Sequence, residues 1–482
     1  MKHNNSDSEK VDHLCGPQQP KVNRLAPRRR LLILSLIFLT ALGVRLLNWH
    51  GSRKEVSAVQ TSVVLNYQQQ ARLIRENGLA SLYDASSSTS NPDLLGHPLG
   101  YPILLSLIHR IAPESDTATQ LVQMMLDSLA AVIICLIAFE LFPTAVGVIS
   151  GLMAAFAPQF SWNSILLLPD SLAALPILLA VLLIVRTRHQ HLIHRPARLL
   201  LLLAAGALIG VSCWLRANAL LLAPFIALLF PIIYKRGERL RPALVLVGAA
   251  CLVIAPLTIR NATVFGEFIP VSLGAGQTLI EGIADYNIDG SLGLPQTDME
   301  LIQGEAETFH RPEYASSLFT PDGPERDRAR LARGLAVVRA HPFWFFGVMV
   351  RRAASMMRLE RTPLRLATTD SVTWQNSFQW PLRTMQRLFI TAIFLPLVFV
   401  GTGILIYRRQ FQSLAILLVV PCYYFCTQSA LHTEYRYVLV IHYFLFVLTA
   451  VAIYSITCQL NRMFTKPSSA ESPSQTLGAA EQ

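Results

Sequence analysis

Long apolar runs, separated by short basic loops, make up most of the chain. An α-helix needs ~20 apolar residues to cross a bilayer, and ten segments approach or reach that length. A membrane β-barrel would show alternating segments of ~10 residues instead. The pattern predicts an all-α polytopic membrane protein, a bundle of about 10–12 transmembrane helices. The expected spans are 31–48, 119–142, 144–168, 170–186, 197–214, 217–234, 241–259, 386–407, 412–430 and 437–457.

Polar segments divide these spans into modules. Two shorter apolar stretches are expected to lie in or re-enter the membrane interface, 103–112 because it is too short to span and 341–357 because its aromatic residues end at Arg351-Arg352. The predicted organisation is a cytoplasmic tail 1–30, an N-terminal transmembrane module 31–259 with a first outer loop 49–118, an extracytoplasmic segment 260–384, C-terminal helices 385–457 and a disordered cytoplasmic tail 458–482.

Composition agrees with a membrane protein. Hydrophobic residues make up 52% of the chain, charged residues 15%, and the mean hydropathy is +0.42. Soluble domains carry roughly 25% charged residues. The net charge of +11 would suggest nucleic acid in a soluble protein, but here Lys and Arg gather in short loops such as 186–198 and 235–241. This positive-inside bias predicts a multi-pass protein of the inner (plasma) membrane, with the N-terminus in the cytoplasm and the loops 49–118 and 260–384 outside.

Arginines occur at the ends of separate spans on the face expected to lie outside. Arg216, Arg260 and Arg436 each have a simple interpretation as loop arginines that extend to the lipid headgroups. A guanidinium group also binds phosphate oxygens in a bidentate manner, and three on one face favour a site for a lipid phosphate. Asp170 opens a helix and is either an N-terminal cap or part of the same site.

Transfer of a sugar from a polyprenyl phosphate needs cationic groups for the departing phosphate and a base for the acceptor. The candidate bases are Glu55, Asp84 and Asp93 of the first outer loop, each of which also reads as a solvated charge. His97 is a candidate base or ligand, or a turn residue before proline. No metal-ligand motif occurs, so no metal residues are predicted, although carboxylates from separate loops leave a divalent cation possible.

Several ordered motifs carry a resemblance to a known family. His97-Pro98-Leu99-Gly100-Tyr101-Pro102 is similar to an HPPGYP-like element, and the Arg-Asn-x4-Gly-x-Phe-x-Pro-x-Ser run of 256–282 is the most specific match. With them, the chain resembles the GT-C glycosyltransferases, in particular the bacterial relatives of protein O-mannosyltransferases and of the lipid A aminoarabinose transferase. The remaining matches, in order, are Arg45, Tyr67–Gly78, Ser164–Asp170, Leu215–Pro224, Ala340-His341-Pro342 and Arg436-Tyr437.

The resemblance implies a lipid-phosphate-sugar donor, an extracytoplasmic active site and an inverting transfer. It assigns Asp170, Arg216, Arg260 and Arg436 to the donor cavity, and the adjacent Asn261 and Tyr101 complete the predicted substrate-binding set. Family members usually carry an Asp, the favoured base, a few residues before the loop tyrosine. Here the six residues before Tyr67 contain no acid. Another first-loop carboxylate therefore substitutes for it, or the chain is a diverged or inactive relative.

The expected partners are a polyprenyl-phosphate-linked sugar and an extracytoplasmic glycan, lipid or protein acceptor, with no nucleic acid. A transporter or flippase of lipid-linked saccharides is the alternative from another class. Transporters often show internal repeats and helices broken near the midplane, whereas here the halves do not match and the polar groups lie at span ends. A polysaccharide polymerase or ligase would use the same kind of donor, and the sequence distinguishes it poorly from a glycosyltransferase.

Overall fold

The computed structural model describes residues 26–56, 59–87, 95–188, 194–360 and 374–465, of which 53–55, 374–379 and 465 are described by backbone alone. Within these ranges every regular element is helical, which confirms the predicted all-α class. Within these ranges, seven helical segments are long and apolar enough to cross a membrane. Five lie within α2 (Pro27–Val56), α5 (Asp116–Leu141), α8 (Asp170–Thr187), α9 (Arg195–Leu215) and α12 (Leu240–Phe265). The other two are α19 (Phe411–Thr427) with η6 (Gln428–Ala430), and η7 (Tyr435–Val438) with α20 (Leu439–Thr465).

The other three expected spans are divided. Segment 386–407 contains the end of α17 (Trp374–Gln386) and all of α18 (Thr391–Tyr407), and the two helices meet at a bend of 55°. If this bent pair is counted as one span, the number of spans is eight. Segment 144–168 forms α6 (Thr144–Phe156) and the short α7 (Pro158–Asn163), because Pro158 excludes Ala157 from the helical conformation. Segment 217–234 forms η4 (Ala217–Ala219), α10 (Leu222–Ala227) and α11 (Phe230–Ile233). The last two segments are therefore shorter apolar helices rather than the full spans that we expected.

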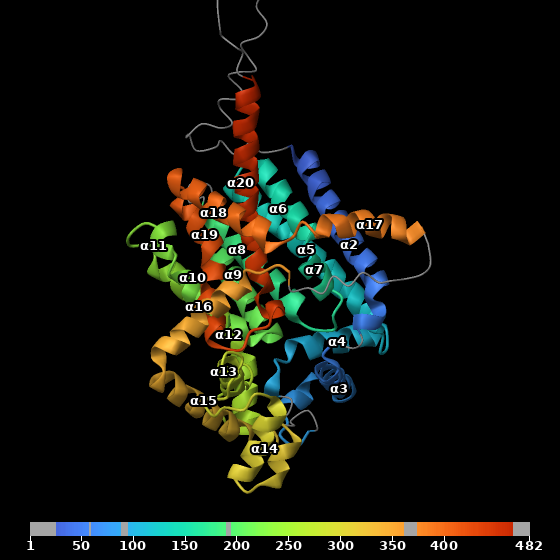
Figure 1. Cartoon of the computed structure of the whole chain (residues 1–482), viewed down its shortest axis with the longest axis vertical. Coiled ribbons are helices and arrows are strands. Elements are labelled where there is room, and N and C mark those ends of the chain that lie inside the picture. The colour runs from blue at the N-terminus through green and yellow to red at the C-terminus, as the bar shows by residue number, and fades with distance from the viewer. Residues whose placement is uncertain (1–25, 57–58, 88–94, 189–193, 361–373, 466–482) are drawn as a thin grey trace, which may run out of the picture.

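Helices α20 and α8 are the most enclosed of the long apolar helices, and α20 runs along the centre of the bundle (Figure 1). Small residues let neighbouring helices approach closely, as is typical of membrane bundles. A Cβ atom at Gly401 of α18 would lie 2.0 Å from the carbonyl oxygen of Leu448 of α20. At Gly206 of α9 it would lie 2.1 Å from the carbonyl oxygen of Leu246 of α12.

One ion pair lies inside the bundle. Arg45 of α2 and Asp127 of α5 are 0% and 1% exposed, and the distance from Arg45 Nη2 to Asp127 Oδ2 is 2.6 Å. Tyr443 of α20 donates to the other carboxylate oxygen at 3.2 Å. Breaking such a buried pair leaves an unpaired charge in an apolar setting, so this contact fixes three helices relative to one another.

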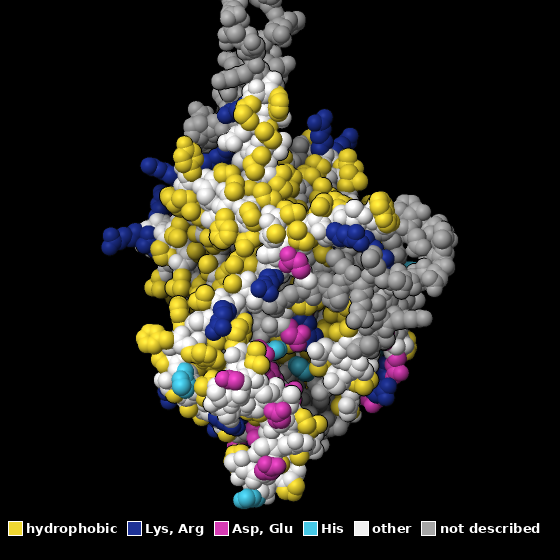
Figure 2. All heavy atoms as spheres, viewed as in Figure 1, with side chains coloured by type: hydrophobic (Ala, Val, Ile, Leu, Met, Phe, Trp, Pro, Cys, Tyr) yellow, Lys and Arg dark blue, Asp and Glu magenta, His cyan; other side chains and the backbone are white. Residues whose placement is uncertain are grey.

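The shorter helices form a polar lobe at one end of the bundle. It contains α3 (Thr61–Asn77), η1 (Leu79–Tyr83), α4 (Gly100–Ile111), α13 (Ala275–Ala284), α14 (Asp298–Thr308), η5 (Pro312–Ser316) and α15 (Gly323–Ala340). In Figure 1 this lobe is the lower end. Figure 2 shows apolar side chains over the upper part of the visible face, and acidic and histidine side chains toward the lobe. This separation of an apolar surface from a polar lobe is expected of a membrane protein with one large part outside the bilayer.

Helix α16 (Pro342–Met356) joins the lobe to the bundle. Its buried face includes Phe345 and Val348, whereas Phe343 and Phe346 are 91% and 66% exposed. A helix with an exposed aromatic face beside basic residues suits a membrane interface. Contact of this helix with lipid stays a prediction.

Substitution of Gly401 tests the close contact between α18 and α20. We expect Gly401→Ala to destabilise the protein by about 1–3 kcal/mol, because the added methyl group overlaps the backbone of Leu448. Gly403 in the same helix is the matched control, since its Cβ would meet no atom within 4 Å. Thermal unfolding in detergent should give a lower melting temperature for Gly401→Ala than for Gly403→Ala. Equal values would contradict this packing.

Candidate functional site

Asp170 is held in place by a buried network of amides. The chain between α7 and α8 runs irregularly, and its carbonyl groups accept hydrogen bonds from two glutamines of α5. Gln120 Nε2 donates to Ile165 O at 2.8 Å, and Gln123 Nε2 donates to Leu166 O and Leu168 O at 2.8 and 3.1 Å. These bonds fix the residues immediately before Asp170, which opens α8 and is 6% exposed.

The turn motif 97–102 contacts α5 and the end of α9. The Tyr101 hydroxyl donates to Gln123 Oε1 at 3.0 Å, so Tyr101 supports the amide network. Gly100 lies against the end of α9, where a Cβ would come within 2.5 Å of the Trp214 carbonyl oxygen. The glycine therefore lets the first loop approach the corner that carries Arg216.

Arg216 follows the last residue of α9 and reaches Asp170. Its Nη2 lies 2.9 Å from Asp170 Oδ1, and its guanidinium carbon lies 4.0 Å from the ring centroid of Tyr437. The corner itself is tied to α19 and to η7 (Tyr435–Val438). Asn218 Nδ2 donates to Tyr437 O at 3.1 Å, and the Tyr423 hydroxyl donates to Asn218 O at 2.8 Å. Two segments more than 200 residues apart are thus held together.

Arg436 enters the same site from η7 (Tyr435–Val438). Its Nη2 donates to Glu434 Oε1 at 2.8 Å and to the Tyr437 hydroxyl at 3.3 Å, and its Nε lies 2.8 Å from Glu434 Oε2. The polar lobe holds the chain just before this pair, since His432 N donates to Thr278 O at 2.7 Å and Arg352 Nη1 donates to Ser429 O at 2.8 Å.

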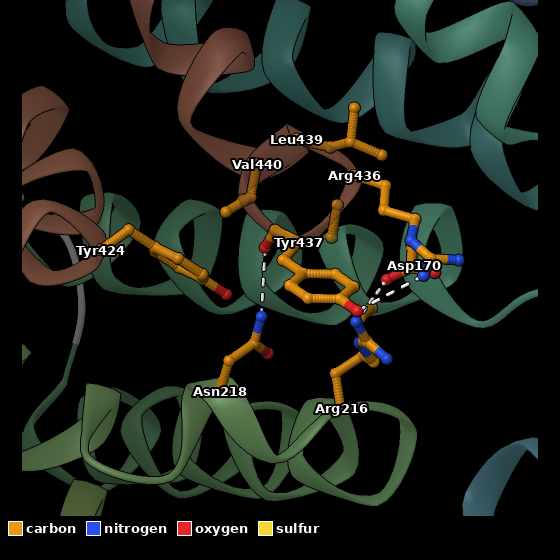
Figure 3. Close-up of a pocket in the computed structure, with 10 residues that line it drawn as sticks. Asp170, Arg216, Asn218, Tyr424, Arg436, Tyr437, Leu439 and Val440 are labelled. Carbon is orange, nitrogen blue, oxygen red and sulfur yellow. Dashed lines mark hydrogen bonds and ion pairs between the residues drawn. The ribbon is translucent and has the colours of Figure 1, made fainter. Parts of the chain in front are cut away.

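These side chains line one pocket, which we call the arginine pocket. Figure 3 shows Arg216 and Arg436 approaching Asp170 and the Tyr437 hydroxyl from different helices. The open space of the pocket, including the solvent at its mouth, is about 230 Å³. Its lining residues are Asp170, Ala173, Ala174, Arg216, Asn218, Tyr424, Arg436, Tyr437, Leu439 and Val440.

Tyr67 and His97 lie next to this charged group. Their ring centroids are 5.1 Å apart, and Tyr67 packs edge-on against Tyr101 at 5.0 Å. Burial and then the charge of Arg216 lower the pKa of His97 to about 4, so the ring is neutral near pH 7. Burial also raises the pKa of Tyr67, with Arg216 opposing this effect. The Tyr67 hydroxyl is buried and has no hydrogen-bond partner among the described residues.

Arg260 and Asn261, near the end of α12, make structural contacts. Arg260 Nε donates to Leu82 O at 3.0 Å, which ties the first loop to α12. Asn261 Nδ2 donates to Ile269 O and Val271 O at 2.9 and 3.1 Å, which folds the following segment back onto the helix. Their assignment to the donor cavity stays a prediction.

The predicted bases lie elsewhere or cannot be placed. Asp84 is exposed, and its carboxylate accepts hydrogen bonds from the Ser86 backbone and hydroxyl, which lower its pKa. Asp93 lies outside the described residues, and Glu55 is described by backbone alone. Across the described ranges, no group of three or more His, Cys, Asp or Glu side chains could hold a metal ion.

Sequence reasoning missed the two glutamines of α5 that position Asp170. The available signal was a pair of amides three residues apart, Gln120 and Gln123, inside an otherwise apolar span. Such a pair lies on one face of a helix, and buried amides need partners. Glu434, two residues before Arg436, was likewise not predicted as a site residue.

The lowered pKa of His97 makes a prediction about the pH dependence of stability. An unfolded histidine has a pKa of ~6.5, so between that value and about 4 the unfolded chain binds a proton that the folded chain does not. The contribution of His97 to the free energy of unfolding is therefore present above pH ~6.5 and decreases as the pH falls toward about 4. Between pH ~7 and ~5 the melting temperature should decrease more in the wild type than in His97→Gln. Parallel profiles would place His97 in a solvated environment instead.

The chain is similar to several known proteins. Residues 96–259 match the model of the dolichyl-phosphate-mannose-protein mannosyltransferase family. No curated protein sequence matches the chain. The oligosaccharyltransferase AglB from Archaeoglobus fulgidus, solved with an inhibitory peptide and dolichol-phosphate, is 17% identical with a TM-score of 0.50 over 92% of this chain and 52% of that one. The chain thus spans about half the length of that enzyme.

Two further structures are similar to different degrees. The oligosaccharyltransferase of the same archaeon tethered to an acceptor peptide is 15% identical with a TM-score of 0.52, over 91% of this chain and 50% of that one. ArnT from Cupriavidus metallidurans bound to undecaprenyl phosphate is 15% identical with a TM-score of 0.33, over 81% and 73%. Residues 96–259 are thus similar to that mannosyltransferase family, and the helical fold of the chain is similar to that of the archaeal oligosaccharyltransferase.

Proposed function

We propose that the protein transfers a sugar from a polyprenyl-phosphate donor to an acceptor on the extracytoplasmic side of the membrane. The observation that carries this proposal is the meeting of Arg216 and Arg436 in one pocket beside Asp170. The two guanidinium groups belong to segments far apart in the chain, and many buried contacts hold them together. A pair of arginines built into the end of a membrane bundle suits a phosphate group attached to a lipid.

Two polar atoms, one beside the pocket and one in its lining, are available to bind the rest of a phosphate-linked sugar. The Tyr67 hydroxyl and Asn218 Oδ1 are buried polar atoms without hydrogen-bond partners among the described residues. Such atoms are costly unless a ligand or water satisfies them. The hydroxyl suits a phosphate oxygen, and the amide oxygen suits a sugar hydroxyl. His97, neutral near pH 7, adds no charge that would attract or repel the phosphate.

The bundle geometry supports an extracytoplasmic site. Helix α9 carries Arg195 and Arg198 at its start and leads into Arg216 at its end, 21 residues later. At 1.5 Å per residue, the length of α9 separates Arg195 from the pocket by about 30 Å, which matches the thickness of the hydrocarbon core of a bilayer. Because short basic loops remain in the cytoplasm, the pocket would open toward the exterior or periplasm.

The relatives suggest the class of donor. AglB was solved with dolichol-phosphate, and the matching family is described by a dolichyl-phosphate-mannose donor and a protein acceptor. Both names contain a polyprenyl-type phosphate. We propose a lipid phosphate for this chain as well, because the arginine pocket supplies groups that bind it. The sugar and the acceptor would be selected by the shape of the site.

Loss of either arginine should weaken phosphate binding. We expect Arg216→Gln and Arg436→Gln each to reduce the affinity of the purified protein for undecaprenyl phosphate in nanodiscs by roughly 10- to 100-fold, the value of one charge-assisted hydrogen bond. Arg195→Gln is the control, because Arg195 pairs with Glu238 at the other end of α9. If wild type and both pocket variants bind equally, the arginines do not hold the phosphate.

The Tyr67 hydroxyl should bind the donor rather than stabilise the fold. Removal of an unpartnered buried hydroxyl relieves a desolvation cost, so Tyr67→Phe should leave the melting temperature unchanged or raise it. The same variant should bind undecaprenyl phosphate about three- to tenfold more weakly. A lower melting temperature with unchanged binding would show that the hydroxyl has a structural partner.

A further inference from the structure

The charges in the arginine pocket are balanced before any donor binds. Asp170 pairs with Arg216, and Glu434 pairs with Arg436 through two contacts of 2.8 Å. In the part of the chain that the structure describes, these are the carboxylates that pair with the two pocket arginines. A phosphate that binds Arg436 must therefore compete with the carboxylate that already occupies the Nε and Nη2 side of that arginine.

The two carboxylates differ in how accessible they are. The side chain of Asp170 is 3% exposed, and it lies behind Arg216 at the start of α8. The side chain of Glu434 is 34% exposed and belongs to the corner between α19 and α20, beside the polar lobe. An acceptor that approaches from the lobe can therefore reach Glu434, whereas it cannot reach Asp170 without displacing Arg216.

Resting on the proposed function, the geometry points to Glu434 as the general base of the transfer, held by Arg436 until the donor phosphate takes its place. In this cycle the phosphate binds Arg216 and Arg436, and the Glu434 carboxylate is released beside it. The carboxylate then has no cation of its own and lies next to the phosphate to which the sugar is attached. A base at Glu434 explains how the chain can catalyse transfer without an acidic residue just before Tyr67.

The chemical step is an inverting substitution. Glu434 accepts the proton of an acceptor hydroxyl, and the oxygen forms a bond to the anomeric carbon of the sugar. The bond between that carbon and the phosphate oxygen breaks, and its electron pair stays on the phosphate. The two arginines stabilise the resulting phosphate monoester, which leaves with its lipid. Glu434 loses its proton when Arg436 pairs with it again.

The test uses Glu434→Gln, with Glu238→Gln as a matched control. Glu238 has a side-chain exposure of 33% and pairs with Arg195 and Arg198, but it lies at the opposite end of the bundle. Purified proteins in nanodiscs are titrated with undecaprenyl phosphate. We expect Glu434→Gln to bind about three- to tenfold more tightly than wild type, because the internal competitor is gone. Glu238→Gln should bind like wild type.

The second readout is transfer. Cells that lack the chromosomal gene are complemented with each variant, and their surface glycans and lipid-linked sugars are compared by mass spectrometry. Glu434→Gln should not restore the product and should accumulate its lipid-linked precursor, whereas Glu434→Asp should restore part of it. If Asp84→Asn abolishes the product and Glu434→Gln does not, the base is Asp84 and this inference is wrong.

The outcomes separate this inference from the proposed function. A wild-type protein that does not bind undecaprenyl phosphate would overturn the proposed function, and the inference with it. Binding that depends on Arg216 and Arg436, together with a fully active Glu434→Gln variant, would overturn the inference alone. Binding by Glu434→Gln that is no tighter than wild type would show that the phosphate and Glu434 do not compete.

Discussion

The ion pair between Asp170 and Arg216 is the contact on which the site depends. A guanidinium group at the edge of the apolar bundle is costly unless an anion or aromatic face accompanies it. Asp170 supplies the anion and Tyr437 the aromatic face. Because Tyr437 is next in sequence to Arg436, the same arrangement that neutralises one arginine also brings the second one into the pocket.

Most of the surrounding polar groups maintain this geometry rather than act on a substrate. Gln120 and Gln123 fix the chain before Asp170, and Gly100 allows the first loop to contact the end of α9. Asn218 joins the Arg216 corner to η7. The 97–102 motif and the membrane helices are thus packed together. A substitution in the first loop would therefore alter the pocket through packing as well as through chemistry.

The sequence predicted the class of fold and much of the pocket, for physical reasons. Apolar periodicity and length report burial in lipid directly, so all ten apolar segments were located. The two that failed as full spans contain prolines whose effect on local conformation outweighs hydropathy. Asp170, Arg216 and Arg436 were predicted because they lie at span ends on the face expected to lie outside, and the pocket brings all three together.

Other parts of the site could not be read from the sequence. Arg260 lies at a span end as Arg216 does, but it donates to the carbonyl group of Leu82, 178 residues away, which only the folded chain reveals. Asn261 donates to carbonyl groups eight and ten residues further along the chain. Glu434 is two residues from Arg436, and its pairing depends on the local turn of η7. Sequence spacing does not show which of several carboxylates faces a pocket built from separate helices.

The most direct test of the central claim is a structure of the protein in nanodiscs with undecaprenyl phosphate, determined by electron cryo-microscopy. The account predicts phosphate density about 3 Å from the guanidinium nitrogens of both Arg216 and Arg436, with the Glu434 side chain turned away from Arg436. A phosphate bound elsewhere, with both ion pairs of the pocket intact, would contradict it.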